Sequence, residues 1–214
     1  MLPKLLLATN NQAKVHEYRH LLQNLPCEMV TLAEQGITTQ VVETGQSMED
    51  NARLKAVVLA KQSRLLALAD DSGLEVDALG GEPGPFSARY AGEAASDKDR
   101  VSYLLAKLKD VPGDKRSARF RCVIALATPD GEVEFCCGEC RGFITFEPRG
   151  EQGFGYDPIF YLPELGKTMA ELSLEAKSQV SHRGQAAREV YQKLDKLTGG
   201  KYFKQNSPNE KREF

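Results

Sequence analysis

The stretch that decides the fold runs from Leu65 to Gly73 and reads LLALADDSG. Its apolar half has the length of a buried strand, and two adjacent acids, Asp70 and Asp71, follow it. Successive side chains of a strand point to opposite faces, so we expect the two acids to lie in different environments. A strand that ends in acids would place them at its carboxyl end, the edge at which open α/β sheets bind ligands. The alternative is a turn with two solvated carboxylates.

The segments before this stretch predict an α/β sheet. Residues 4–8, KLLLA, predict a buried first strand that stops at Thr9, and from Val15 onward apolar residues recur at helical spacing. A second helix is expected after Ser47, which with Asp50 forms a capping-box pattern, and it leads back into LLALADDSG. Two βα passages that involve buried strands are typical of an α/β sheet.

The second half of the chain predicts a long loop, a hairpin and C-terminal helices. The Gly- and Pro-rich residues 79–92 form the loop, and a helix capped by Ser96 and Asp99 follows it. Residues 119–139 resemble an antiparallel hairpin that turns at 129–131. A helical region is expected from about Thr168, and its polar continuation after residue 200 is expected to fray. The predicted apolar stripe of this region comprises Ala187, Val190, Tyr191, Leu194 and Leu197.

Composition excludes several classes of protein. The chain has 214 residues, 41% of them hydrophobic and 27% charged, which is ordinary for a globular protein. Its net charge of -2 provides no overall positive field for a nucleic-acid polymer or an anionic membrane. No apolar run reaches the length of a membrane span or a signal-peptide core, so we expect a soluble cytoplasmic protein. Five cysteines with one isolated C-x-x-C spacing, Cys137 to Cys140, favour reduced structural thiols over a zinc site.

The segment TNNQAK, from Thr9 to Lys14, is a candidate phosphate site. It combines a hydroxyl, carboxamides and a lysine at a junction where unpaired helix amides point outward. Neutral donors and one cation can share the charge of a triphosphate with those amides. The alternative is a polar helix cap with a solvated lysine, because the segment lacks the glycines of a Walker A loop.

Glu43, in the segment ETG, is a candidate metal ligand. The ordinary interpretation of Glu43 is a surface glutamate without a functional role. If the fold brings Glu43 beside the acids of DDSG, the three form an all-oxygen site of the kind that Mg²⁺ prefers, completed by water and phosphate oxygens.

Two later segments are candidates for recognition of a base. GFGYDPIF, residues 153–160, carries Phe154, whose ring face could stack on a base, and the alternative is an aromatic-anchored turn before a strand. KSQVSHRGQA places Lys177, His182 and Arg183 within seven residues, where they could bind phosphate or a base carbonyl. The alternative there is a solvated helix face.

Taken together, these segments resemble the Ham1/RdgB family of inosine triphosphate pyrophosphatases, which hydrolyse non-standard purine nucleoside triphosphates. The matching motifs are ATNNQAK, ETG, ADDSGLEVDALGGEPGPFSARYAG, GFGYDPIF and KSQVSHRGQA, in the family's order over about residues 5–190. The resemblance implies an elongated two-lobed α/β protein, in which helices flank a mixed sheet and a ligand cleft separates the lobes. It further implies one domain over residues 1–200, a homodimer and a requirement for Mg²⁺.

The resemblance also implies roles for individual residues. Asp71 matches the proposed general base and metal ligand, Glu43 a second metal ligand, and Ser72 a substrate contact, whereas the role of Asp70 stays open. The other substrate-binding positions that it implies are Thr9, Asn10, Asn11, Gln12, Ala13, Lys14, Phe154, Gly155, Tyr156, Asp157, Lys177, His182 and Arg183.

The expected reaction is hydrolysis of ITP, dITP or XTP to the nucleoside monophosphate and pyrophosphate, which cleanses the nucleotide pool. One alternative is a Maf-like pyrophosphatase that acts on other modified or pyrimidine nucleotides. Another is a non-catalytic nucleotide sensor or RNA-binding module. The net charge argues against RNA, and the acids of DDSG argue against a protein that only binds.

Overall fold

The computed structural model describes residues 2–200, and the strands within this range form one open mixed sheet in the order β2-β1-β3-β4-β5-β6-β7. β1 pairs in parallel with β2 and β3, whereas the remaining neighbours pair antiparallel. This confirms the predicted α/β class. The strands are β1 (Lys4–Leu7), β2 (Glu28–Thr31), β3 (Leu66–Val76), β4 (Ser117–Ala127), β5 (Val133–Ile144), β6 (Phe160–Leu162) and β7 (Lys167–Thr168).

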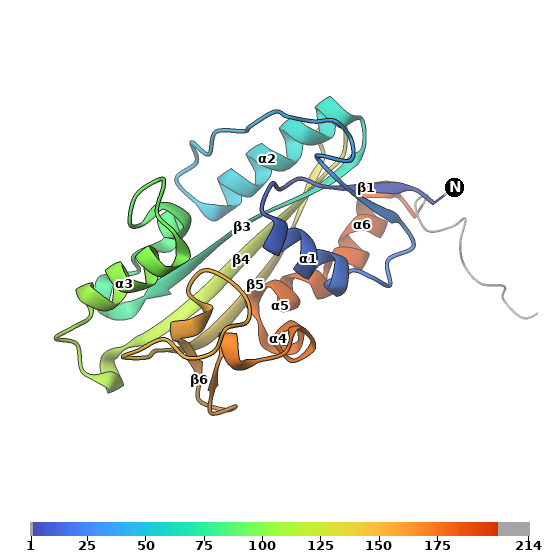
Figure 1. Cartoon of the computed structure of the whole chain (residues 1–214). Coiled ribbons are helices and arrows are strands. Elements are labelled where there is room, and N and C mark those ends of the chain that lie inside the picture. The colour runs from blue at the N-terminus through green and yellow to red at the C-terminus, as the bar shows by residue number, and fades with distance from the viewer. Residues whose placement is uncertain (1, 201–214) are drawn as a thin grey trace, which may run out of the picture.

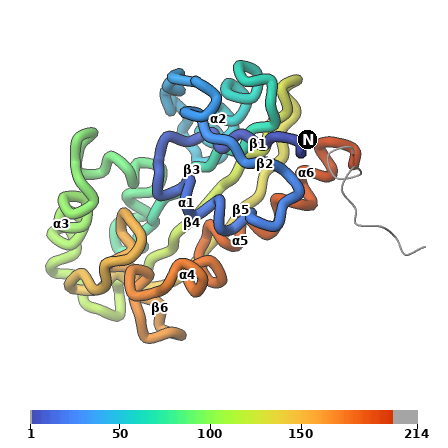
Figure 2. Tube along the Cα trace, turned by 45° about the vertical axis from the view of Figure 1, so that its right-hand side comes forward, coloured from blue at the N-terminus to red at the C-terminus, as the bar shows by residue number. Residues whose placement is uncertain are grey.

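Helices flank the sheet on both faces. α2 packs on one face of β3 and β4, and α5 and α6 pack on the other face of β4 and β5 (Figure 1). The turned view in Figure 2 keeps α3 and β6 at one end of the molecule and β1, β2 and α6 at the other. The helices are α1 (Gln12–Leu21), α2 (Met48–Ser63), α3 (Asp97–Lys107), α4 (Leu174–Val180), α5 (His182–Arg188) and α6 (Val190–Thr198). The 3-10 turns are η1 (Asp77–Leu79), η2 (Gly84–Arg89), η3 (Gly113–Lys115), η4 (Asp157–Ile159) and η5 (Met169–Glu171).

The strand that carries the two acids continues past them, so the prediction that it ends there was wrong. β3 pairs in parallel with β1 only as far as Leu68, and then continues antiparallel to β4 as far as Val76. Its long antiparallel partner therefore keeps it extended through the polar residues. Because β1 ends at Leu7, the acids of β3 lie just beyond the carboxyl end of β1. From that point on, β3 has no β1 neighbour on that side.

Most of the other predicted elements are present with different bounds. The Ser96–Asp99 capping box is confirmed, whereas the Ser47 side chain accepts from the Asp50 amide without the reciprocal bond of a full box. The predicted hairpin is confirmed as β4 and β5, which are longer than expected. The loop at 79–92 contains η2, and the region after Thr168 divides into η5 and three short helices. Tyr191 is 49% exposed, so its place in the apolar stripe was wrong.

Three apolar clusters hold the fold together. Two of them lie on opposite faces of the sheet near β1, one under α1, α5 and α6 and the other under α2. The third lies at the far end, between the sheet, α3 and β6. β3, β4 and β5 contribute residues to the cores at both ends of the molecule. The predicted polar tail, 201–214, lies outside the described residues.

Two smaller features complete the fold. All five cysteines are free thiols, four of them buried and Cys137 exposed. Burial raises the pKa of the Cys122 and Cys140 thiols to about 11. Within residues 2–200, no helix combines the length and the apolar character that crossing a bilayer requires.

Candidate active site

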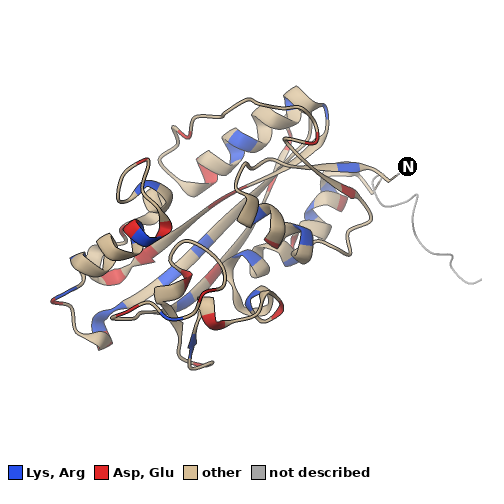
Figure 3. Cartoon of the chain, viewed as in Figure 1, with Lys and Arg blue, Asp and Glu red and all other residues tan. Residues whose placement is uncertain are grey.

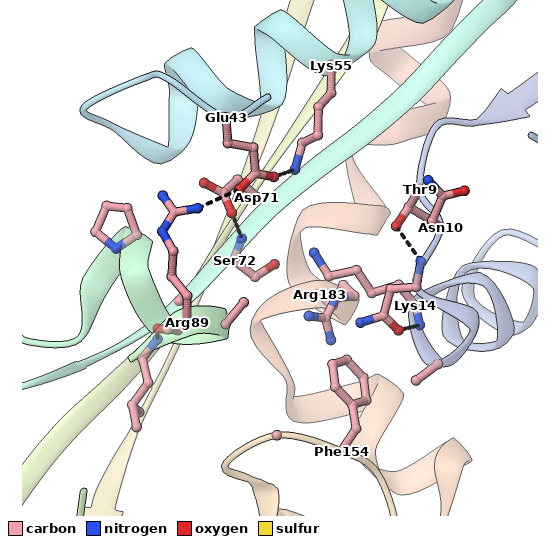
Figure 4. A pocket seen from close by; sticks show the side chains of 18 of the residues that line it. Thr9, Asn10, Lys14, Glu43, Lys55, Asp71, Ser72, Arg89, Phe154 and Arg183 are labelled. Atoms are coloured by element: carbon pink, nitrogen blue, oxygen red, sulfur yellow. Dashed lines mark hydrogen bonds and ion pairs between the residues drawn. The ribbon is translucent and has the colours of Figure 1, made fainter. Parts of the chain in front are cut away.

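A cavity of about 570 Å³ lies between α1, α2, η2, α5 and the loop before η4, beside the middle of β3 (Figure 4). Most of the residues predicted for the site line it, although they come from segments far apart in the sequence. The predicted residues that line it are Thr9, Asn10, Asn11, Ala13, Lys14, Glu43, Asp71, Ser72, Phe154, Gly155, Tyr156, Asp157, His182 and Arg183. Gln12 and Lys177 are not among the lining residues of this part of the structure.

Asp70 faces α1 and α5, and two cations and one hydroxyl group lie around its Oδ2 atom. Its Oδ2 lies 2.9 Å from Lys14 Nζ and 3.6 Å from Arg183 Nε, and it accepts a 2.8 Å hydrogen bond from Ser72 Oγ. Burial opposes ionisation of this carboxyl group, but the charges of Lys14, Arg183 and Lys55 outweigh burial and lower its pKa. Asp70 is therefore a permanent anion that holds two pocket cations and the Ser72 hydroxyl in place.

Asp71 faces the opposite side of β3, toward α2, as strand alternation predicts. Its Oδ2 accepts a 3.1 Å hydrogen bond from Asn51 Nδ2, and its Oδ1 accepts one of 2.9 Å from the Ser72 amide. Burial raises its pKa above the usual 3.8, although Lys55 and Lys14 oppose the rise. A carboxylate that is more basic than usual and borders a cavity is suited to accept a proton.

Glu43 reaches the same region from the segment before α2. Lys55 Nζ donates to Glu43 Oε1 at 2.5 Å and to the main-chain oxygen of Asp70 at 2.7 Å. Arg89 Nη1 lies 3.9 Å from the other oxygen of Glu43. The fold thus brings Glu43 into the cavity that Asp71 lines, as the metal-site hypothesis requires.

Asn51 connects the two candidate metal ligands, and the sequence reasoning missed it. Its Nδ2 donates to Asp71, while its Oδ1 accepts a 2.8 Å hydrogen bond from the Gly45 amide, two residues after Glu43. A Cβ atom at position 45 would lie 2.7 Å from Asn51 Oδ1, so the close approach requires glycine. Asn51 and Lys55 are one helical turn apart beside the apolar face of α2. This spacing, which places both side chains on the same side of the helix, was the sequence signal that could have identified Asn51.

The donor set at Glu43 and Asp71 fits a hard divalent cation. Both carboxylates line the cavity, and the charge of Glu43 raises the pKa of Asp71, a repulsion that a bound cation would relieve. Among residues 2–200 no group of three or more His, Cys, Asp or Glu side chains has the arrangement of a complete protein cage. Mg²⁺ commonly binds through one or two carboxylates, with water and substrate phosphates as its other ligands.

The phosphate-site candidate adopts the predicted strand-to-helix junction. Asn11 caps α1, since its Oδ1 accepts a 3.1 Å hydrogen bond from the Lys14 amide, and Thr9 Oγ1 accepts one of 3.2 Å from the Asn11 amide. The amino end of α1 therefore borders the cavity with Lys14 beside it. The Gln12 side chain bonds to the Asn10 oxygen at 3.5 Å instead.

At the other end of the cavity, the Phe154 ring lies beside two cations. Lys177 Nζ and the Arg183 guanidinium carbon are each 5.1 Å from its centroid. The loop is held by Asp157, whose Oδ2 accepts a 2.9 Å hydrogen bond from the Phe154 amide and pairs with Lys177 at 2.5 Å. Asp157 and Lys177 thus fix the shape of the loop around Phe154.

Glu17 is a second residue that the sequence reasoning missed. It is buried on α1, and its two oxygens bind Lys177 at 2.6 Å and Arg183 at 2.7 Å. Burial opposes its ionisation, but the two cations outweigh burial and lower its pKa. A single acid beside the apolar positions Val15 and Tyr18 of an amphipathic helix was the only local signal.

His182 is buried as a neutral imidazole. Its ring stacks on Phe120 at a centroid distance of 4.7 Å, and burial together with Arg183 and Lys177 lowers its pKa well below 6.5. Its Nδ1 has no hydrogen-bond partner among the described residues, and the residue lines the cavity. The fold thus places a neutral imidazole at the wall of the cavity.

The electrostatic environment of the cavity is mixed rather than uniformly positive. Figure 3 shows Lys and Arg interspersed with Asp and Glu on the elements around the sheet. Within the cavity, Lys14, Lys55 and Arg183 lie within 3 Å of acidic side chains that hold them in place. Several cations are thus gathered in the cavity of a chain whose net charge is -2.

Comparisons with known proteins identify the family to which the chain belongs. The Ham1 family model matches residues 5–193. A dITP/XTP pyrophosphatase of Desulforamulus reducens is 50% identical over 91% of this chain and 96% of the relative, and one of Thermus thermophilus is 51% identical over 86% and 88%. A solved HAM1 protein from Coxiella burnetii has a TM-score of 0.82 and 42% identity, over 92% of this chain and all of that chain. The chain therefore belongs to the Ham1 family.

Proposed function

We propose that this protein hydrolyses non-standard purine nucleoside triphosphates, namely ITP, dITP and XTP, to the nucleoside monophosphate and pyrophosphate. The observation that carries the proposal is one cavity with two different ends. At one end, the carboxylates of Asp71 and Glu43 border the cavity together with Lys55. At the other end, two cations lie beside the aromatic ring of Phe154. The first end suits a metal-bound phosphate chain, and the second suits a purine base.

In the proposed mechanism, Asp71 accepts a proton from the water that attacks the α-phosphorus. The bond from the α-phosphorus to the bridging oxygen breaks, and pyrophosphate leaves with its electron pair. Glu43 and Asp71 would hold Mg²⁺, which supplies charge neutralisation on the phosphates and lowers the pKa of bound water. Lys14 and the amino end of α1 hold the phosphate chain, and Ser72 contacts the substrate beside Asp71.

Selection of the base is proposed to depend on hydrogen-bond donors near Phe154. Hypoxanthine and xanthine present an acceptor oxygen where adenine presents an amino donor, so a donor such as Arg183 at that edge favours them. A site built on polar pairing can discriminate by ~10⁴-fold or more. The neutral His182 lines the same cavity and is proposed as a further substrate contact.

We further propose that the protein uses Mg²⁺ and acts as a cytoplasmic homodimer, as the family resemblance implies. The lining of the cavity supports substrate-binding roles for Thr9, Asn10, Asn11, Ala13 and Lys14, for Phe154 to Asp157, and for His182 and Arg183. Lys177 is proposed to act through Phe154 and Asp157, because it is buried beneath them.

A substrate panel tests the function. The protein with Mg²⁺ is incubated separately with ITP, dITP, XTP, dUTP, ATP and GTP, and the products are separated and identified. IMP and pyrophosphate from ITP, with little turnover of ATP and GTP, is the expected result. Preferential cleavage of dUTP would favour a Maf-like enzyme, IDP with orthophosphate would contradict the assigned bond, and no turnover at all would favour a nucleotide sensor.

A further inference from the structure

The loop before α3 brings a cation, Arg89, into the cavity. Arg89 is the last residue of η2 and lines the cavity with a side chain that is 31% exposed. Its guanidinium lies 5.3 Å from the Phe86 ring centroid and 3.9 Å from Glu43. In Figure 4 it reaches toward Glu43 and Asp71 from the side of the cavity opposite Lys14. Arg89 therefore reaches the metal-site end of the cavity from a segment with no other role in the proposed mechanism.

The ion pair of Arg89 is longer than those of the neighbouring pocket cations. Lys14 lies 2.9 Å from Asp70, Lys55 lies 2.5 Å from Glu43, and Arg183 lies 2.7 Å from the buried Glu17. The 3.9 Å contact of Arg89 is made to a carboxylate that Lys55 already holds. Partly exposed ion pairs of this length contribute little energy, so the guanidinium can exchange this contact for a better anion.

The backbone that carries Arg89 is firmly held against β3. Ser87 Oγ accepts a 2.9 Å hydrogen bond from the Leu74 amide and donates one of 2.6 Å to the Gly84 oxygen. The buried Tyr156 hydroxyl donates a 3.0 Å hydrogen bond to the Ser87 oxygen. A Cβ atom on Gly73 would lie 2.2 Å from the Gly84 oxygen. The close approach of these two segments therefore requires glycine at position 73, the last residue of DDSG. Because this backbone is already fixed, the binding of an anion costs only the conformational entropy of the Arg89 side chain.

We propose that Arg89 is a further catalytic residue, which binds the β- and γ-phosphates and stabilises the departing pyrophosphate. The inference rests on the proposed cleavage of the α–β anhydride. Figure 4 places Glu43 and Asp71 on the far side of the cavity from Phe154, so phosphates that reach beyond Asp71 come within range of Arg89. A guanidinium offers paired donors that match phosphate oxygens, and its charge offsets the negative charge that develops on the leaving group.

The proposed substrate contact also resolves a competition at Glu43. Glu43, which would hold the divalent cation, would then bind Arg89 and Lys55 less strongly, because its negative charge would be shared among three cations. The phosphate oxygens of the substrate would provide Arg89 with a replacement partner. Arg89 therefore exchanges Glu43 for the phosphate chain when substrate binds.

The test compares Arg89→Gln and Arg89→Lys with Arg53→Gln, a control at an exposed position of α2. For each variant, kcat/KM for ITP and the product-inhibition constants of pyrophosphate and IMP are measured separately. We expect Arg89→Gln to lose ~10- to 100-fold in kcat/KM, the equivalent of one charge-assisted hydrogen bond or a bidentate pair. The inhibition constant of pyrophosphate should rise by a similar factor while that of IMP stays unchanged, and Arg89→Lys should recover part of both effects.

Two results would overturn the proposal for Arg89. One is an unchanged pyrophosphate inhibition constant in Arg89→Gln, and the other is an equal rise for pyrophosphate and IMP, which would indicate a general disturbance of the cavity. Circular dichroism and thermal unfolding check that both variants are folded as the wild type is. If the wild-type protein releases no pyrophosphate from ITP, the proposed function itself fails, and that result is known before any variant is measured.

Discussion

Asp70 and Asp71 are consecutive residues of β3, yet their carboxylates bind partners from opposite faces of the sheet. Asp70 pairs with Lys14 of α1 at 2.9 Å, and Asp71 accepts a hydrogen bond from Asn51 of α2 at 3.1 Å. Their pKa values move in opposite directions, because several cations surround Asp70 whereas burial dominates at Asp71. One acid is therefore suited to a constant charge, and the other to gaining and losing a proton.

The first prediction concerns the proposed base. Asp71→Asn should lower kcat for ITP by at least ~10²- to 10⁴-fold, the usual contribution of a positioned general base. The shape of the side chain is kept, and the cations around Asp70 are untouched, so the protein should remain folded. Steady-state kinetics and Mg²⁺ binding, measured by calorimetry, check this. Turnover near the wild-type rate, with metal still bound, would remove Asp71 from the mechanism.

The second prediction concerns the stability that Asp70 contributes. Asp70→Asn removes a buried anion that balances Lys14 and Arg183, and such a loss costs ~3 to 5 kcal/mol in the free energy of unfolding. Because the folded-state pKa of Asp70 is below its usual 3.8, the contribution is fully present above that value and is lost as pH falls toward the folded-state pKa. Urea unfolding at neutral pH should therefore show the full difference in the free energy of unfolding between the wild type and Asp70→Asn. A difference that does not shrink below pH 3.8 would contradict this account.

The third prediction is a shift in pH dependence. Asn51→Asp keeps an acceptor for Gly45 but replaces the donor to Asp71 with a second acid, which should raise the pKa of Asp71 further. Activity requires ionised Asp71, so the acid limb of the kcat/KM profile should move to higher pH. Glu49→Gln, at a partly exposed position on the same helix, is the control. An acid limb that stays in place would show that Asp71 does not set it.

The fourth prediction concerns the metal. Chelation with EDTA should abolish activity, and Mg²⁺ should restore it. Glu43→Gln should raise the Mg²⁺ concentration that gives half-maximal rate, because one of two proposed carboxylate ligands is lost. Glu28→Gln, at an exposed position of β2, should leave that concentration unchanged. If Glu43→Gln needs no more Mg²⁺ than the wild type, Glu43 is not a ligand.

The sequence predicted those parts of the site that depend on local pattern. The junction from Thr9 to Lys14 and the opposite faces of the two acids follow from strand alternation and helix capping. The continuation of β3 beyond Asp71 could not be foreseen, because it depends on pairing with β4, about fifty residues later. The bond from Lys177 to Glu17 joins residues 160 positions apart, so only the tertiary fold reveals that Glu17 belongs to the site.

Arg89 and Lys55 were missed for a different reason. Each lies in a segment whose other residues predict ordinary structure, a Gly- and Pro-rich loop and an amphipathic helix. Their relevance comes from a shared contact with Glu43, which itself lies in a segment without helix or strand. A charge on a surface segment does not indicate its partner until the strands have placed the segments together.

Hydrolysis of ITP in water enriched in oxygen-18 tests the central claim, that water attacks the α-phosphorus. Mass spectrometry of the separated products locates the oxygen that water contributes. We predict that the label enters IMP and that pyrophosphate carries none above background. Label in pyrophosphate would mean attack at the β-phosphorus, and IDP with labelled orthophosphate would mean attack at the γ-phosphorus. Either result would contradict the proposed mechanism.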